Sequence, residues 1–154
     1  RDLEDWRDFV TRPPEVYEAW VDGVSKECEI LELRILENLR TQGKPVFVDT
    51  NISLDTLKLI APPQHVLIML VDPEVSVRRF FERPDLEKQF LFRLLMAEDN
   101  PEQAMENFRQ GLMRVNSPQR YQRFLNAGFP VILRDDRRSI EDTLLLVEKV
   151  FGLI

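Results

Sequence analysis

Charged residues follow three apolar segments of the sequence, and these positions are where its side chains could do chemistry. The segment "PVFVD" ends at Asp49, "VLIMLVD" ends at Asp72, and "VILR" ends at Arg134. Ligands of open parallel sheets bind beyond the carboxyl ends of the strands. If the three segments are parallel strands, their terminal side chains meet at one edge of the sheet. Polar residues also occur wherever a strand leaves the core, so any one of these positions is weak evidence for a binding site. Only the three positions together favour one.

An arginine cluster follows the second segment directly. The stretch "EVSVRRFFERPD" contains Arg78, Arg79 and Arg83, and guanidinium groups bind phosphate through two parallel hydrogen bonds. Adjacent residues of a helix cannot share a face, which separates Arg78 from Arg79, whereas Arg79 and Arg83 are four apart and can. A solvated helix with local Arg–Glu pairs would have the same composition. Combined with the three strand ends, the cluster favours a site for an anionic ligand.

Composition excludes several classes of protein. The chain has 154 residues, enough to bury one core, and its net charge of −6 is wrong for a general nucleic-acid binder. The only cysteine is Cys28 and the only histidine is His65, which excludes an internal disulfide and a Cys/His zinc cluster. No apolar run approaches the roughly 20 residues of a membrane span. We therefore expect a soluble, cytoplasmic protein.

The apolar pattern predicts alternating helices and strands. A long amphipathic helix begins at Pro13 and Pro14, which suit a first helical turn, and ends near Gly43. Continuous apolar runs at 45–49, 65–71 and 129–134 indicate strands covered on both faces. Helices fill the intervals, including a helical insertion or lid at about 84–127. The order predicts a single α/β domain over residues 1–154, a three-layer fold with a parallel sheet.

Several blocks of the sequence resemble P-loop NTPases. "VLIMLVDPEVSVRRFFERPD" is similar to the fourth strand and lid of shikimate-kinase-like and other nucleotide-kinase-like proteins, "GKPVFVDTN" to their third strand, and "PVILRDDRRSIEDTLLLVEKVFGL" to their end. "WRDFVTRPPEVYEAW", "FFERPDLEKQF" and "GFPVILRDD" resemble an uncharacterised bacterial branch of this family. The resemblance covers most of the chain and implies a P-loop kinase fold.

The same resemblance implies roles for the candidate residues. Asp49 would be a catalytic residue that contacts either magnesium or the substrate; the strand-end Asp of a P-loop phosphotransferase holds magnesium directly or through water. Arg83 would approach the phosphates, and one of Arg78 and Arg79 would pack on the adenine. Arg134, from the third strand end, joins the arginines as an expected nucleotide-binding residue.

The phosphate-binding motif of the family is absent. GxxxxGK(S/T) does not occur, and the one Gly-Lys pair, Gly43-Lys44, is followed by Pro45, which lacks the N–H that a phosphate loop needs. We expect either the C-terminal portion of a larger protein, without the first strand and phosphate loop, or a natural degenerate relative. ATP and magnesium are expected cofactors of the complete protein, and neither is firmly expected for this chain alone.

Two functions stay open at this point. The first is a nucleotide-dependent, kinase-like phosphotransferase acting on an unknown small acceptor. The second is a non-catalytic α/β binding or regulatory domain that has lost ATP, with residues 84–127 as its partner surface. The expected partners are a nucleotide and a small-molecule acceptor, without nucleic acid or membrane, and a homodimer stays open. The strand at 129–134 is expected beside 65–71, and Pro84 is expected to keep Arg83 out of a helix.

Overall fold

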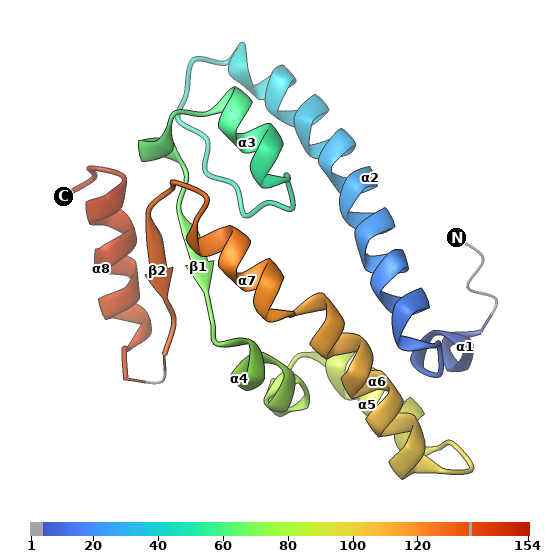
Figure 1. Ribbon diagram of the computed structural model, residues 1–154. Helices are drawn as coiled ribbons and strands as arrows, with labels where there is room; N and C mark the ends of the chain where they lie inside the picture. Colours follow the sequence, from blue (N-terminus) through green and yellow to red (C-terminus); the bar gives the residue numbers. More distant parts are fainter. Residues whose placement is uncertain (1–4, 136) are drawn as a thin grey trace.

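Helices form most of the protein. The computed structural model describes residues 5–135 and 137–154. Figure 1 shows the long helix α2 running beside α6 and α7, with two short strands and α8 at the far end from α1. The elements are α1 (Trp6–Val10), α2 (Pro14–Arg40), α3 (Leu54–Ile60), η1 (Pro63–His65), β1 (Ile68–Leu70), α4 (Pro73–Arg78), η2 (Phe80–Glu82), α5 (Leu86–Met96), α6 (Pro101–Val115), α7 (Pro118–Leu125), β2 (Val131–Leu133) and α8 (Ile140–Val150).

The predicted three-layer α/β fold, with its parallel P-loop kinase sheet, is wrong. The described residues form a sheet of only two strands, each three residues long. β1 and β2 run parallel, with Ile68 opposite Val131 and Leu70 opposite Leu133. The predicted pairing of 129–134 with 65–71 is confirmed. The remaining apolar surface is buried mainly between helices, and so the α/β description does not fit.

The expected strand at 45–49 does not form. The segment between Pro45 and Asp49 has no regular secondary structure, and no backbone hydrogen bond joins it to another described residue. Val46, Phe47 and Val48 are exposed. An apolar, β-branched run shows that a segment suits a strand, but a strand exists only where a neighbour accepts its ladder of hydrogen bonds. That neighbour is missing among the described residues.

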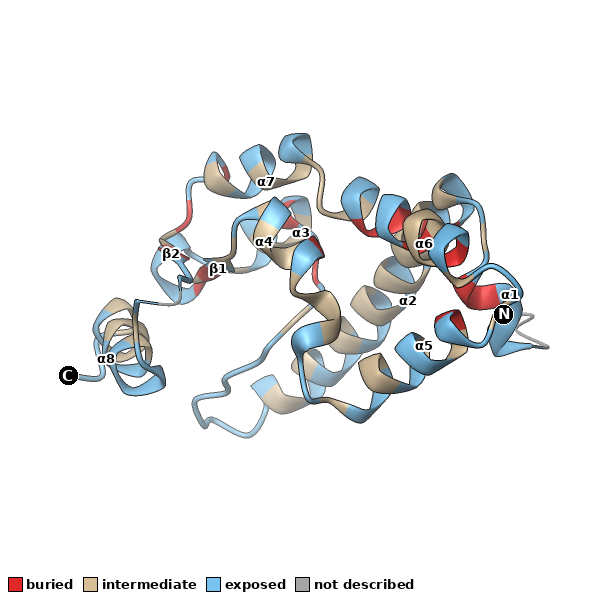
Figure 2. Ribbon diagram, turned by 90° about the horizontal axis from the view of Figure 1, so that it is seen from below, coloured by how far each residue is buried: buried red, intermediate tan, exposed pale blue. Residues whose placement is uncertain are grey.

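The main core lies between helices. Its buried members come from the five helices α1, α2, α4, α5 and α6, and they are Phe9, Val10, Tyr17, Val77, Leu95, Ala104, Phe108 and Leu112. Gly111 lets α6 approach α2 closely, because a methyl group at this position would come within 3.0 Å of the Tyr17 ring. Figure 2 shows buried positions on α1, α5 and α6, which lie at the same end of the molecule. The predicted insertion at 84–127 thus supplies much of the core.

A second, smaller cluster surrounds the sheet. It consists of Leu54, Val66, Ile68, Ala127 and Phe129, which join α3, β1 and the segment that leads into β2. α8 contributes no buried residue and lies at the edge of the molecule in Figure 2. The second half of the apolar stripe of α2 is also uncovered, since Leu31 and Ile35 are exposed. This part of the predicted stripe does not face the core.

Helix starts follow the local sequence signals. Ser53, Asn100 and Ser117 cap α3, α6 and α7 through their side chains. Ser139 and Asp142 form a complete capping box at α8. These contacts satisfy backbone N–H groups that a helix leaves unpaired at its first turn. They fix where each helix begins and where the preceding segment must end.

Candidate functional site

A pocket of about 460 Å³ lies at the carboxyl ends of β1 and β2, beside α4. We name it the arginine pocket. It is lined by Val71, Asp72, Val75, Ser76, Arg79, Glu82, Arg83, Pro84, Arg134 and Asp135. The position agrees with the strand-end rule, although the sheet has only two strands. Three of the five residues predicted from the sequence to form a site are together here.

The two strands position the first part of the arginine pocket. The backbone N–H of Arg134 donates to the carbonyl of Leu70 at 2.6 Å, which extends the pairing one residue beyond β2. Asp72 then caps α4, because its Oδ1 accepts hydrogen bonds from the N–H groups of Glu74 at 2.9 Å and Val75 at 3.2 Å. Strand pairing and this cap together bring Arg134 next to the first turn of α4.

The end of α4 and the segment after it supply the other two arginines. Arg79 is the C-cap of α4, and its Nε donates to Oε2 of Glu82 at 2.6 Å. Arg83 is extended, with φ −72° and ψ 136°, and the predicted restriction by Pro84 is confirmed. The Arg83 carbonyl accepts a hydrogen bond from Nε2 of Gln89 at 3.0 Å. The segment is therefore anchored to α5 through its backbone, while the guanidinium remains available.

The acidic side chains of the arginine pocket already have partners. Asp72 is used as a helix cap, Glu82 pairs with Arg79, and Oδ1 of Asp135 accepts from the N–H of Arg137 at 3.0 Å. The guanidinium groups of Arg83 and Arg134 make no hydrogen bond or ion pair within residues 5–135 and 137–154. The pocket therefore presents two unpaired positive charges beside a third arginine that is already oriented by Glu82.

Arg78 does not reach the arginine pocket. Its side chain lines a second pocket, between α4 and α6, together with Glu74, Val77 and Phe81. The prediction that Arg78 and Arg79 cannot share a face is confirmed. A role for Arg78 at the same phosphate groups as Arg79 and Arg83 has no support in this arrangement, and its predicted contact with an adenine ring stays a prediction.

Asp49 also lies outside the arginine pocket. It is exposed, and the residues that follow it are tied to α2: the hydroxyl of Thr50 bonds to Glu32, and the N–H of Asn51 donates to Glu32 at 3.1 Å. Its predicted role in holding magnesium stays a prediction. Within the described ranges, no group of three or more His, Cys, Asp or Glu side chains is arranged to hold a metal ion.

Sequence reasoning missed a network of charges between α2 and α7. Arg120 donates to both carboxylate oxygens of Asp22, at 2.7 and 2.8 Å, and to Glu18 at 3.0 Å. The hydrogen bond from Arg120 holds the pKa of the Asp22 carboxyl below its usual range. The signal was in the sequence, because Glu18, Asp22, Glu29 and Glu32 recur at helical spacing. Every charge of this network has a partner, which indicates a joint between helices.

Residues 5–135 and 137–154 contain no helix that is long and apolar enough to cross a membrane. The chain matches no model of a known protein family, no curated protein and no solved structure.

Proposed function

We propose that the arginine pocket binds the phosphate groups of a small phosphorylated molecule, with a nucleotide as the expected class. One observation carries the proposal: Arg83 and Arg134 line one pocket next to Arg79, and their guanidinium groups make no hydrogen bond or ion pair with a described residue. Guanidinium groups bind phosphate oxygens through charge-assisted hydrogen bonds, which are the strongest kind available to a partly exposed site. A volume of about 460 Å³ suits a small molecule better than a protein segment.

Electrostatics support a phosphate over a carboxylate ligand. A carboxylate offers one negative charge and two oxygens, and a single arginine satisfies it. Two unpaired guanidinium groups and a third that is already oriented match the several oxygens and higher charge of a pyrophosphate group. Binding should weaken with salt, since the pocket is open to solvent and ions screen exposed charges.

Phosphoryl transfer is the catalytic form of this proposal. The protein would then act as a nucleotide-dependent, kinase-like phosphotransferase on an unknown small acceptor, with ATP and magnesium as cofactors and Arg83 at the phosphates. The alternative is a non-catalytic binding or regulatory domain, for which phosphate binding alone suffices. The geometry of the arginine pocket supports the binding step, which the two forms share. Turnover of magnesium-ATP by the protein distinguishes them.

Titration with inorganic pyrophosphate tests the binding step. We expect Arg83→Gln and Arg134→Gln each to weaken pyrophosphate binding about tenfold, the loss typical of one charge-assisted contact. Arg93→Gln is the matched control, because Arg93 is an exposed arginine of α5 outside the arginine pocket. Equal losses in all three variants would mean non-specific attraction and would overturn the proposal. Comparing pyrophosphate with ADP then shows whether a nucleoside adds affinity.

A further inference from the structure

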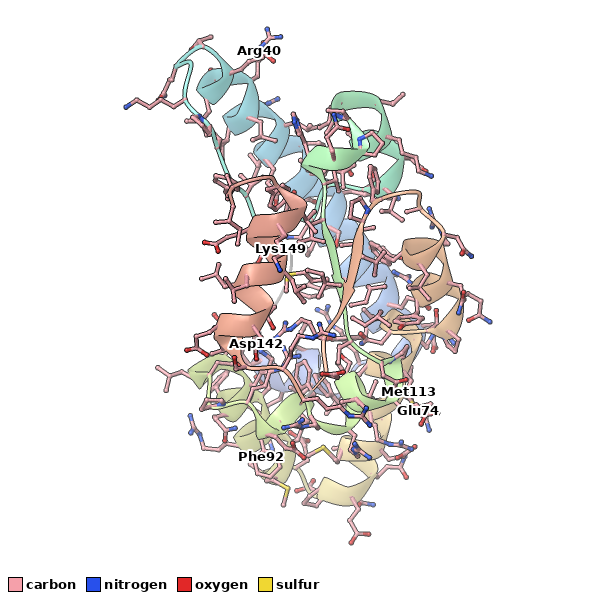
Figure 3. The ribbon with its side chains drawn as sticks, turned by 90° about the vertical axis from the view of Figure 1, so that its left-hand side faces the viewer. Arg40, Glu74, Phe92, Met113, Asp142 and Lys149 are labelled. Atoms are coloured by element: carbon pink, nitrogen blue, oxygen red, sulfur yellow. The ribbon has the colours of Figure 1, made fainter. Side chains whose placement is uncertain are left out.

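The largest of the pockets described lies between α4 and α6 and is separate from the arginine pocket. Its volume is about 640 Å³, and we name it the apolar pocket. It is lined by Pro73, Glu74, Val77, Arg78, Phe81, Met105, Arg109, Leu112, Met113, Asn116 and Pro118. Figure 3 shows Glu74 of α4 and Met113 of α6 next to each other at one side of the molecule. Small-molecule sites have this size and this mainly apolar lining.

The interior of the apolar pocket is suited to an apolar body. Val77 and Leu112 are buried parts of the main core and form a rigid base, and Phe81 adds a half-buried ring. Met105 and Met113 provide the walls from α6. Methionine side chains are unbranched and polarisable, and so they adapt to ligands of different shape. The base is therefore fixed, whereas the walls can close on what enters.

The polar rim leaves one guanidinium without a partner. Arg109 donates twice to Glu106, at 2.9 and 3.0 Å, and Nδ2 of Asn116 donates to the carbonyl of Leu112 at 2.8 Å. Arg78 makes no hydrogen bond or ion pair with any residue that the structure describes. Glu74 also lines this pocket, and its carboxylate repels a second negative charge on a ligand.

We propose that the apolar pocket binds a small molecule with an apolar body and a single negative charge, such as an alkyl or aromatic carboxylate, and that Arg78 holds its carboxylate. The unpaired Arg78 selects a negative group, and Glu74 limits it to one charge. Val77, Leu112 and the two methionines receive the apolar part. The proposal does not depend on phosphate binding in the arginine pocket, because the two pockets share no lining residue.

The four methionines provide a direct readout. Met105 and Met113 line the apolar pocket, whereas Met69 is in β1 and Met96 is the last residue of α5. We would label the methionine methyl groups with ¹³C and titrate the protein with octanoate and, separately, with octylamine. We expect the signals of Met105 and Met113 to shift and those of Met69 and Met96 to stay. Octanoate should bind about fivefold or more tightly than octylamine, because its charge pairs with Arg78.

Two methionines of equal exposure give a matched pair of variants. Met113 is 49% and Met96 is 50% exposed, and both are on helices. Met113→Asp should weaken octanoate binding about tenfold, since a charge in an apolar site is costly, and Met96→Asp should leave it unchanged. Arg78→Gln, at an exposed position, should abolish the preference for octanoate over octylamine, and it tests the site even if Met113→Asp does not fold.

Three results would overturn the proposal. The first is a shift of all four methionine signals together, which means general adsorption to exposed apolar surface. The second is an equal loss of octanoate binding in Met96→Asp and Met113→Asp. The third is an unchanged preference for octanoate in Arg78→Gln, which removes Arg78 as the anchor.

Discussion

Arg78 and Arg79 are neighbours in the sequence, yet their side chains line two different pockets, one on each side of α4. The cause is the geometry of the helix, in which each residue is rotated by about 100° from the one before it. Val77 and Arg78 therefore face α6, whereas Val75, Ser76 and Arg79 face the strand ends. A six-residue helix thus separates the apolar pocket from the arginine pocket.

This separation predicts that two arginine variants affect two different ligands. Arg78→Gln should weaken the binding of octanoate and leave that of pyrophosphate unchanged. Arg83→Gln should do the reverse, since Arg83 lines only the arginine pocket. Calorimetric titration of both variants with both ligands is the measurement. If each variant weakens both ligands equally, the two pockets act as one site and the assignment of Arg78 is wrong.

Asp49 provides a prediction that separates metal binding from phosphate binding. Because Asp49 is exposed and lies outside the arginine pocket, Asp49→Asn should change the free energy of unfolding by less than about 0.5 kcal/mol. It should also leave the affinity for pyrophosphate unchanged. The role predicted from the sequence requires that any magnesium-dependent turnover of ATP falls sharply in this variant.

The control for this prediction is Asp55→Asn, another exposed aspartate, in α3. Turnover that survives in Asp49→Asn at the level of Asp55→Asn would remove Asp49 from the reaction. A weaker affinity for pyrophosphate in Asp49→Asn alone would place it nearer to the arginine pocket than the structure does.

The pair between Asp22 and Arg120 predicts a dependence of stability on pH. The hydrogen bond from Arg120 lowers the pKa of Asp22 in the folded protein, and so the ionised pair stabilises the fold above the ordinary pKa of an aspartate, about 4. This contribution is lost as the pH falls through the lower pKa of the folded state. Asp22 is 44% exposed, and solvent screening keeps the effect below about 1 kcal/mol.

Urea unfolding of the wild type and of Asp22→Asn measures this contribution. We expect the difference in the free energy of unfolding to be largest near neutral pH and to shrink below about pH 4. Asp8→Asn is the control, because Asp8 is exposed and makes no hydrogen bond or ion pair with another residue in the described part of the chain. A difference that grows as the pH falls contradicts the assigned direction of the pKa shift.

Two glycines in helices should respond to alanine in opposite ways. A methyl group at Gly23 in α2 would have no heavy atom within 4 Å, and so Gly23→Ala should stabilise the protein by about 0.5–1 kcal/mol through helix propensity. A methyl group at Gly111 in α6 would lie 3.0 Å from Cδ1 of Tyr17. Gly111→Ala should therefore destabilise the protein by about 1–3 kcal/mol, as overpacking does.

Thermal and urea unfolding of Gly23→Ala and Gly111→Ala measure the two changes in stability. If Gly111→Ala stabilises the protein as much as Gly23→Ala, the Tyr17 ring can move without cost and the contact between α2 and α6 is looser than described. A loss in Gly111→Ala together with a gain in Gly23→Ala confirms that the close approach of these two helices limits the core.

Local signals in the sequence were reliable guides to local structure. Ser53, Asn100 and Ser117 cap helices because each side chain bonds to a backbone N–H only a few residues ahead. Arg83 is extended because the ring of the following Pro84 disfavours helical backbone angles at Arg83. The strand-end argument predicted that Arg134 joins the arginines that follow β1, and the pairing of β1 with β2 does bring it to Arg79 and Arg83. The helical spacing expected for Arg79 and Arg83 does not apply, because Arg83 is extended.

The sequence by itself determined the starts of α3, α6 and α7 and the opposite faces of Arg78 and Arg79, because each depends on spacing along the chain. Only the tertiary structure decided how many strands pair. Residues 45–49 and 68–70 have similar apolar sequences, yet only the second is a strand, since hydrogen bonds of a sheet come from another part of the chain. It also decided that α2 and α6 bury the core between helices and that Asp49 lies outside the arginine pocket.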